Sequence, residues 1–184
     1  MLLPNKPHMQ LKNPQSKIHR SLRLALLVTI GLIIFVFENY LPRPLPWAKP
    51  GLANIASVLA LYWFGIPSAL IVTVLRILLG AMIVGSLFNP AFLLSLGGGL
   101  FAVFAMGVTR YLGKQYFSMI GISVIGAFFH IFTQFVLAYF LLINQIVIFY
   151  FLPAMLISSV ITGLGVGILS FLLDKKLTDS GIIE

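Results

Sequence analysis

Cysteine is absent from the 184-residue sequence, and only four residues are acidic. The chain therefore has no disulfide, no thiolate nucleophile and no cysteine ligand for a metal. A magnesium ion that holds a diphosphate needs carboxylates close together, and Glu38 is the only acidic residue before Asp174. We therefore expect a protein that is not an enzyme by itself and that binds no metal and no cofactor.

Charge of either sign is scarce, since Asp, Glu, Lys and Arg make up only 9% of the residues and 60% are hydrophobic. A soluble domain would carry about 25% charged residues, and the mean hydropathy of +1.07 excludes one here. No charged residue occurs between Gln115 and Leu173, a stretch long enough to cross a bilayer twice. The formal charge of +8 could suggest nucleic acid, but the basic residues flank apolar segments, which is typical of a membrane protein.

Prolines, glycines and polar dipeptides divide the chain into six apolar segments. Because a single chain crosses lipid as helices or as a closed barrel, these segments predict an all-α integral membrane protein, a compact bundle of about six helices. We expect a disordered basic tail at 1–20, the transmembrane domain at 21–173 and a second tail at 174–184. The segments lie at about 21–40, 51–64, 68–88, 91–109, 116–142 and beyond Asn144-Gln145 to 173.

Two of these segments leave alternatives open. The segment at 51–64 is short for a full crossing, so it is either tilted in thinner membrane or only partly inserted. In the last segment, Pro153 either kinks a long helix or lies in the first turn of a shorter one.

The basic residues also predict an orientation. Six crossings place both termini on one side, and nine basic residues fall on that side, against only Arg43 and Lys49 on the other. The positive-inside rule therefore predicts cytoplasmic termini and an inner (cytoplasmic) membrane location. The nine are Lys6, Lys12, Lys17, Arg20, Arg23, Arg110, Lys114, Lys175 and Lys176.

Arg76 is the polar residue that is most costly to place in a membrane. It lies near the middle of its segment, where an arginine costs about 2.5–3.5 kcal/mol on insertion scales. Either it binds a ligand, or it forms a structural ion pair or hydrogen bonds to backbone. Glu38, at the outer end of the first segment, is the carboxylate available to pair with it, unless it is simply solvated at the interface.

The segment at 116–142 carries Ser123, Gly126, His130, Thr133 and Gln134 at spacings of three and four residues. Such spacings place them on one helix face, where His130 and Gln134 either hydrogen-bond to another helix or contact a ligand.

In the predicted orientation Glu38, Asn54, Arg76, His130 and Gln134 all lie between the midplane and the outer surface. We therefore expect an outward-opening pocket for a small anionic or amphipathic ligand. Lys49 and Glu38 would lie at its mouth, and the proline-rich loop 41–50 would act as a lid.

Glycines and other small residues form two further groups. Gly97, Gly98 and Gly99 in the fourth segment, and Gly163 and Gly167 in the last, let helix backbones approach closely, or they expose backbone to a ligand. Ser21, Ala25 and Thr29 form a stripe of small residues on the first segment, which we expect to contact another membrane helix.

Several of these residues lie in motifs that resemble a known family. The chain resembles the Gx transporter family, which is also labelled heptaprenyl diphosphate synthase component I. The resemblance is carried by Lys-Pro-Gly-Leu-Ala-Asn-Ile at 49–55, Arg76, Gly97-Gly98-Gly99 and Met106. The resemblance extends over about 21–173, and its other motifs are Ile-Gly-Ile-Ser-Val-Ile-Gly-Ala at 120–127 with His130 and Gln134, Tyr-Phe-Leu-Pro at 150–153, and Thr162-Gly163.

The resemblance implies one of two functions. The family is similar in architecture to the S components of energy-coupling factor transporters. This similarity implies a substrate-binding subunit that captures a solute. It also implies that the stripe of Ser21, Ala25 and Thr29 docks on a transmembrane coupling subunit with ATPases. The synthase label implies instead an accessory membrane subunit of a heptaprenyl or polyprenyl diphosphate synthase or quinone-biosynthesis system, with a soluble prenyl synthase as partner. A stand-alone carrier or a structural subunit is a third interpretation.

Overall fold

The computed structural model describes residues 14–40, 51–113 and 116–180, and within these ranges the protein is helical and has no strand. The prediction of an all-α fold is confirmed. The helices are α1 (Pro14–Tyr40), α2 (Asn54–Phe64), α3 (Ile66–Val84), α4 (Pro90–Leu112), α5 (Met119–Ala138) and α6 (Leu152–Asp179), with a π-helical turn, η2 (Tyr139–Ile143), and a 3₁₀ segment, η3 (Ile146–Phe151), between α5 and α6.

In the described part of the chain, five helical segments are long and apolar enough to cross a membrane. They contain α1, α3, α4, α5 and α6, whereas α2 has only 11 residues. The expected six crossings are thus an approximation: five long helices surround a short one. An 11-residue helix is about 16 Å long, roughly half the thickness of a hydrocarbon core.

Helix ends differ from the expected ones at both termini. Helix α1 begins at Pro14, so the last residues of the segment expected to be disordered are helical, and α6 continues to Asp179 in the expected C-terminal tail. The break at Asn144 is as expected, and Asn144 adopts the left-handed conformation with a φ of 44°. Pro153 lies in the first turn of α6, where its missing N–H costs no hydrogen bond.

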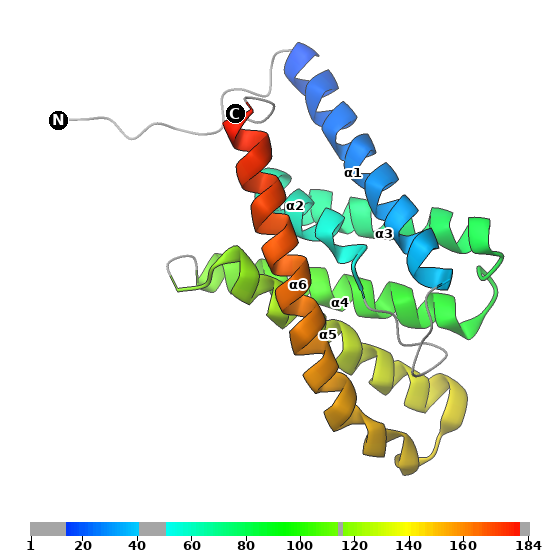
Figure 1. The fold of residues 1–184 in the computed structure, drawn as a ribbon. Helices are drawn as coiled ribbons and strands as arrows, with labels where there is room; N and C mark the ends of the chain where they lie inside the picture. The colour runs from blue at the N-terminus through cyan, green and yellow to red at the C-terminus, as the bar shows by residue number, and fades with distance from the viewer. Residues whose placement is uncertain (1–13, 41–50, 114–115, 181–184) are drawn as a thin grey trace.

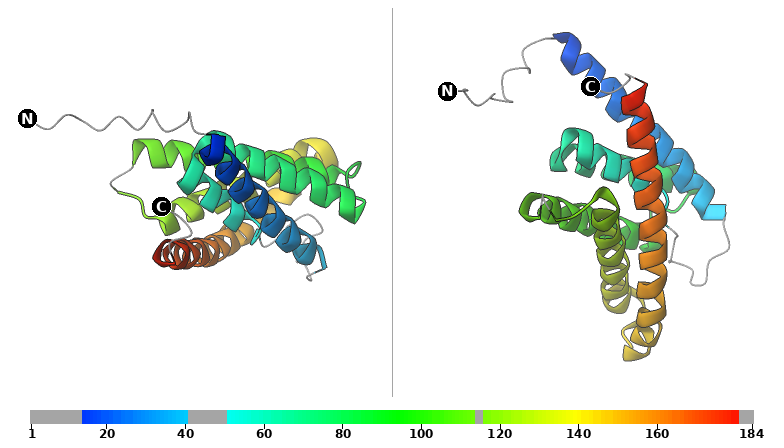
Figure 2. Two further views of the ribbon diagram at one scale, coloured as in Figure 1. Left: turned by 90° about the horizontal axis from the view of Figure 1, so that it is seen from above. Right: turned by 60° about the vertical axis from the view of Figure 1, so that its left-hand side comes forward.

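The helices pack around α2 (Figure 1). Helices α3 and α4 run side by side in opposite directions, α5 packs against both α4 and α6, and α1 leans across α2 and α3. The start of α1 and the end of α6 lie at the same end of the molecule (Figures 1 and 2). The turn between α3 and α4 lies at the other end, which we call the α3–α4 end.

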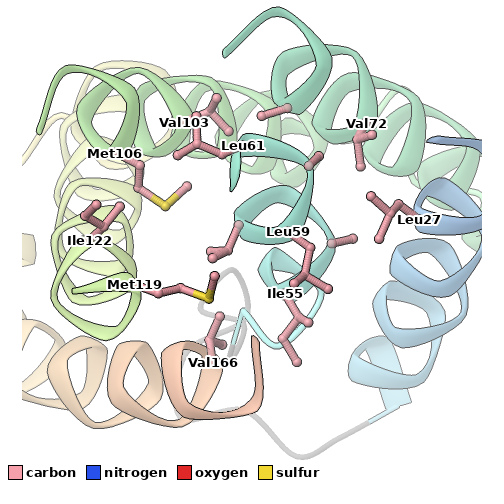
Figure 3. Packing of buried hydrophobic residues seen from close by; sticks show 14 residues of the cluster. Leu27, Ile55, Leu59, Leu61, Val72, Val103, Met106, Met119, Ile122 and Val166 are labelled. Atoms are coloured by element: carbon pink, nitrogen blue, oxygen red, sulfur yellow. The ribbon is translucent and has the colours of Figure 1, made fainter. Parts of the chain in front are cut away.

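Helix α2 forms the centre of the hydrophobic core. All seven residues from Ile55 to Leu61 are buried. Figure 3 shows three of them, Ile55, Leu59 and Leu61, among Leu27 of α1, Val72 of α3, Met106 of α4 and Val166 of α6. A helix that is apolar all round is stable only when it is enclosed in this way, and its central place fixes both of its ends within the bundle.

Glycines allow the closest contacts between helices. A Cβ atom at Gly163 or Gly167 of α6 would lie 2.8 Å from the Cα of Val124 or 2.7 Å from the Cα of Ile120, both on α5. At the same contact the Ser123 hydroxyl donates to the Gly163 carbonyl at 2.9 Å. Similarly, Gly97 faces Leu137, and Gly99 faces Ile77 and Thr73 of α3. Each of these glycines faces a neighbouring helix.

The stripe of Ser21, Ala25 and Thr29 is exposed on α1. The Thr29 hydroxyl donates to the carbonyl of Ala25 at 2.9 Å, so its hydrogen-bonding capacity is used within the helix. The stripe therefore presents a smooth, small-residue surface at the outside of the bundle.

Candidate functional site

The buried polar cluster is centred on Arg76 of α3. Its side chain is only 3% exposed, and one terminal nitrogen donates a hydrogen bond to the Oδ1 atom of Asn54 in the first turn of α2. The stem of Arg76 passes α1 where Gly31 leaves room for it, since a Cβ atom at Gly31 would lie 3.1 Å from the Cδ of Arg76. The guanidinium is thus held between α1 and α2, remote from either end of α3.

Glu38 reaches the same place from the last turn of α1 and is 1% exposed. Its Oε1 accepts from the backbone N–H of Leu52, and its Oε2 accepts from that of Ala53 at 3.4 Å. These two N–H groups lie just before α2, where the helix dipole also favours a negative charge. The carboxylate interacts electrostatically with Arg76, so it stabilises both the guanidinium and the amino end of α2.

Two cavities adjoin the cluster. The smaller, about 20 Å³ in volume, is lined by Glu38, Asn54, Arg76 and His130, together with Phe35, Gly51, Ile77 and Ser95; this is enough space for about one water molecule. The larger, about 230 Å³, lies at the α3–α4 end and shares Phe35, Ile77 and Ser95 with the smaller one. Its other lining residues are Asn39, Ala81, Val84, Ser86, Asn89, Ala91 and Phe92.

His130 and Gln134 extend the cluster along α5. Both are buried, and the Gln134 amide nitrogen lies 3.2 Å from the Nε2 atom of His130. Gly98 of α4 allows this arrangement, because a Cβ atom there would lie 3.0 Å from Gln134 Cγ and 3.1 Å from His130 Nδ1. His130 lines the small cavity, whereas Gln134 is not among its lining residues.

The structure thus brings together four of the six residues expected to bind a ligand: Glu38, Asn54, Arg76 and His130 line one cavity. Gln134 contacts one of them, and Lys49 and the proline-rich loop lie outside the described residues. Sequence reasoning missed Phe35, Ile77 and Ser95, which form the wall between the two cavities. In the sequence Phe35 and Ile77 look like ordinary core residues, and only the packing of the helices shows that they line both cavities.

The carboxyl end of α2 carries a second polar group. Arg110 of α4 donates to the carbonyls of Leu61 and, at 3.2 Å, Tyr62, and it lies over the Tyr62 ring at 4.4 Å. The Trp63 indole donates to Asp174 of α6 at 2.6 Å. The sequence indicated Arg110 only as an orientation signal. Its contacts show that it also satisfies carbonyls that a helix end leaves free.

The fold and the cluster define an all-α membrane protein that holds an arginine, a carboxylate and an amide inside its bundle. Among the described residues no group of three or more His, Cys, Asp or Glu side chains could hold a metal ion. The sequence matches the family described as heptaprenyl diphosphate synthase component I over residues 27–173, and the chain belongs to that family. Neither a curated protein nor a solved structure matches the chain.

Proposed function

We propose that the chain is a non-catalytic membrane subunit, component I, of a prenyl diphosphate synthase system, and that it holds a soluble synthase subunit at the inner membrane. The observation that carries this proposal is the family match across residues 27–173. The five long apolar helices supply the membrane anchor. The cytoplasmic termini predicted by the positive-inside rule would face such a partner.

The distribution of carboxylates supports a non-catalytic role. Transfer of a prenyl group from its diphosphate needs carboxylates that hold magnesium on that diphosphate. This sequence has four acidic residues, of which Glu38 is committed to the amino end of α2 and Asp174 to Trp63. The other two, Asp179 and Glu184, lie five residues apart near the end of the sequence, and we place the magnesium-binding carboxylates on a partner subunit.

Fractionation of cells that produce the synthase with and without this chain tests the proposal. We expect the synthase in the membrane fraction only when the chain is present, and a higher yield of long-chain prenyl product there. A synthase that remains soluble at equal expression in both cell types would contradict the proposal.

A second candidate is supported by the two cavities. A subunit that binds a solute for uptake needs polar side chains beside a cavity, and Arg76, Asn54 and His130 line a small cavity next to one of about 230 Å³. In that case the exposed Ser21, Ala25 and Thr29 stripe would dock on a transmembrane coupling subunit with ATPases, as the resemblance to S components implies.

Uptake measurements on Arg76→Ala distinguish this candidate. The variant should lose uptake of the solute that co-purifies with the chain, whereas Lys175→Ala, at an exposed position on α6, should retain it. Equal uptake by the two folded variants would remove the cavity from any transport role.

A further inference from the structure

The positive groups around the small cavity exceed the negative ones in the described residues. Arg76 contributes one full charge, and the amino end of an α-helix acts as about half a positive charge. Glu38 is the carboxylate that lies against both. A buried charge that is only partly compensated favours a further anion.

Arg76 also retains a free donor. Its Nε atom is buried and has no hydrogen-bond partner among the described residues, although its NH2 group donates to Asn54. A buried donor without a partner costs about 1–3 kcal/mol. Arg76 lines the small cavity, so the side chain that carries this donor forms part of the cavity wall.

Glu38 occupies the position that a bound anion would take. Its two oxygens accept from successive backbone N–H groups at the amino end of α2, an arrangement by which helices bind carboxylates and phosphates of ligands. The Glu38 side chain is 1% exposed, so its withdrawal requires the last turn of α1 to move, and helices fray most readily at their ends.

We propose that the Glu38 carboxylate is a built-in occupant of an anion site, and that a carboxylate or phosphate group of a small ligand replaces it beside Arg76 and the amino end of α2. The uncharged part of the ligand lies in the adjoining cavity of about 230 Å³, between Phe35, Phe92 and the polar Asn89. The inference rests on the ligand-binding role given above as the second candidate, and not on the synthase partnership.

Carbon-13 NMR of the unaltered full-length chain tests the exchange directly. The sequence contains only two glutamates, Glu38 and Glu184, so carboxyl-labelled glutamate gives two signals, which a Glu184→Gln variant assigns. The chain is placed in phosphatidylcholine nanodiscs, and inorganic phosphate is added at constant ionic strength. We expect phosphate to shift the Glu38 signal and to leave the Glu184 signal unchanged, and the shift to disappear in Arg76→Gln.

Phosphate affinity of two charge-removing variants gives an independent result. Glu38→Gln should bind phosphate at least about tenfold more tightly than the unaltered chain, because a like charge a few ångströms away has been removed. Asp174→Asn, which removes a carboxylate at the other end of α2, should bind it as the unaltered chain does. A second preparation containing phosphatidylglycerol, whose phosphate is not neutralised by a choline group, shows whether an anionic lipid headgroup produces the same shift without added phosphate.

An unchanged Glu38 signal at saturating phosphate would overturn the exchange, even if Glu38→Gln failed to fold. Phosphate binding that depends on Arg76 but leaves Glu38 unmoved would refute the exchange and retain the cavity as a ligand site. Absence of phosphate binding in all variants would refute both the exchange and the cavity as an anion site.

Discussion

Arg76 is compatible with an apolar bundle because two residues from other helices meet it. Asn54 accepts its hydrogen bond and Glu38 compensates part of its charge, while Glu38 is itself bound to backbone N–H groups. Removing one member of a buried ion pair leaves the charge of the other uncompensated, whereas removing both members leaves no buried charge. The three residues should therefore act as a unit.

A double-mutant cycle measures the interaction free energy between Arg76 and Glu38. Arg76→Met alone should lower the free energy of unfolding by about 3–5 kcal/mol, since it leaves a buried carboxylate without its cation. Arg76→Met combined with Glu38→Gln should cost less than the sum of the single variants by about 0.5–3 kcal/mol. Reversible unfolding in mixed micelles gives these values, and strict additivity would show that the two charges do not interact.

The cost of burying a polar side chain is what made part of the cluster predictable from the sequence. Arg76, His130 and Gln134 interrupt apolar segments, so each demanded a partner or a ligand. No such signal identifies Phe35 or Ser95, because an aromatic residue or a serine in a membrane helix needs no special neighbour. Their part in the cavity walls follows from the angle between α1, α3 and α4, which the sequence does not specify.

At the scale of the elements, helix α2 is held at both ends by side chains from other helices. Glu38 binds its amino end and Arg110 its carboxyl end, each at the pole of the helix dipole that favours its charge. The sequence indicated a short second segment but not these contacts, because the spacing along the chain between a helix end and its capping residue is arbitrary.

Loss of the Arg110 contacts should destabilise the bundle. Arg110→Gln removes a charged donor from two carbonyls and should lower the free energy of unfolding by about 1.5–3 kcal/mol. Lys175→Gln, which removes a charge at an exposed position, serves as the control and should change it by less than about 0.5 kcal/mol. An equal effect of the two substitutions would mean that Arg110 does not hold α2.

The α5–α6 pair supplies a second prediction at this scale. Gly163→Ala and Gly167→Ala place a methyl group under 3 Å from backbone atoms of α5, and such overpacking typically costs about 1–3 kcal/mol. Gly165→Ala meets nothing within 4 Å, so it should be neutral or stabilising. Thermal unfolding of the three variants checks the contrast, and equal stability would refute the close contact.

For the whole molecule, the predicted orientation can be tested with single cysteines because the chain has none of its own. His19→Cys at the start of α1 and Ser180→Cys after α6 should react with a membrane-impermeant maleimide only in permeabilised cells. Phe88→Cys in the exposed α3–α4 turn should react in intact cells. The opposite pattern would reverse the orientation, and the unaltered chain is the blank.

The chain belongs to the component I family, and we propose that it acts at the membrane through a partner subunit. Native mass spectrometry of the gently purified full-length chain tests this most directly, because it reports partner subunits and bound small molecules together. We predict a complex with a soluble prenyl diphosphate synthase subunit. A complex with a transmembrane coupling subunit and ATPases, and without a synthase, would contradict it.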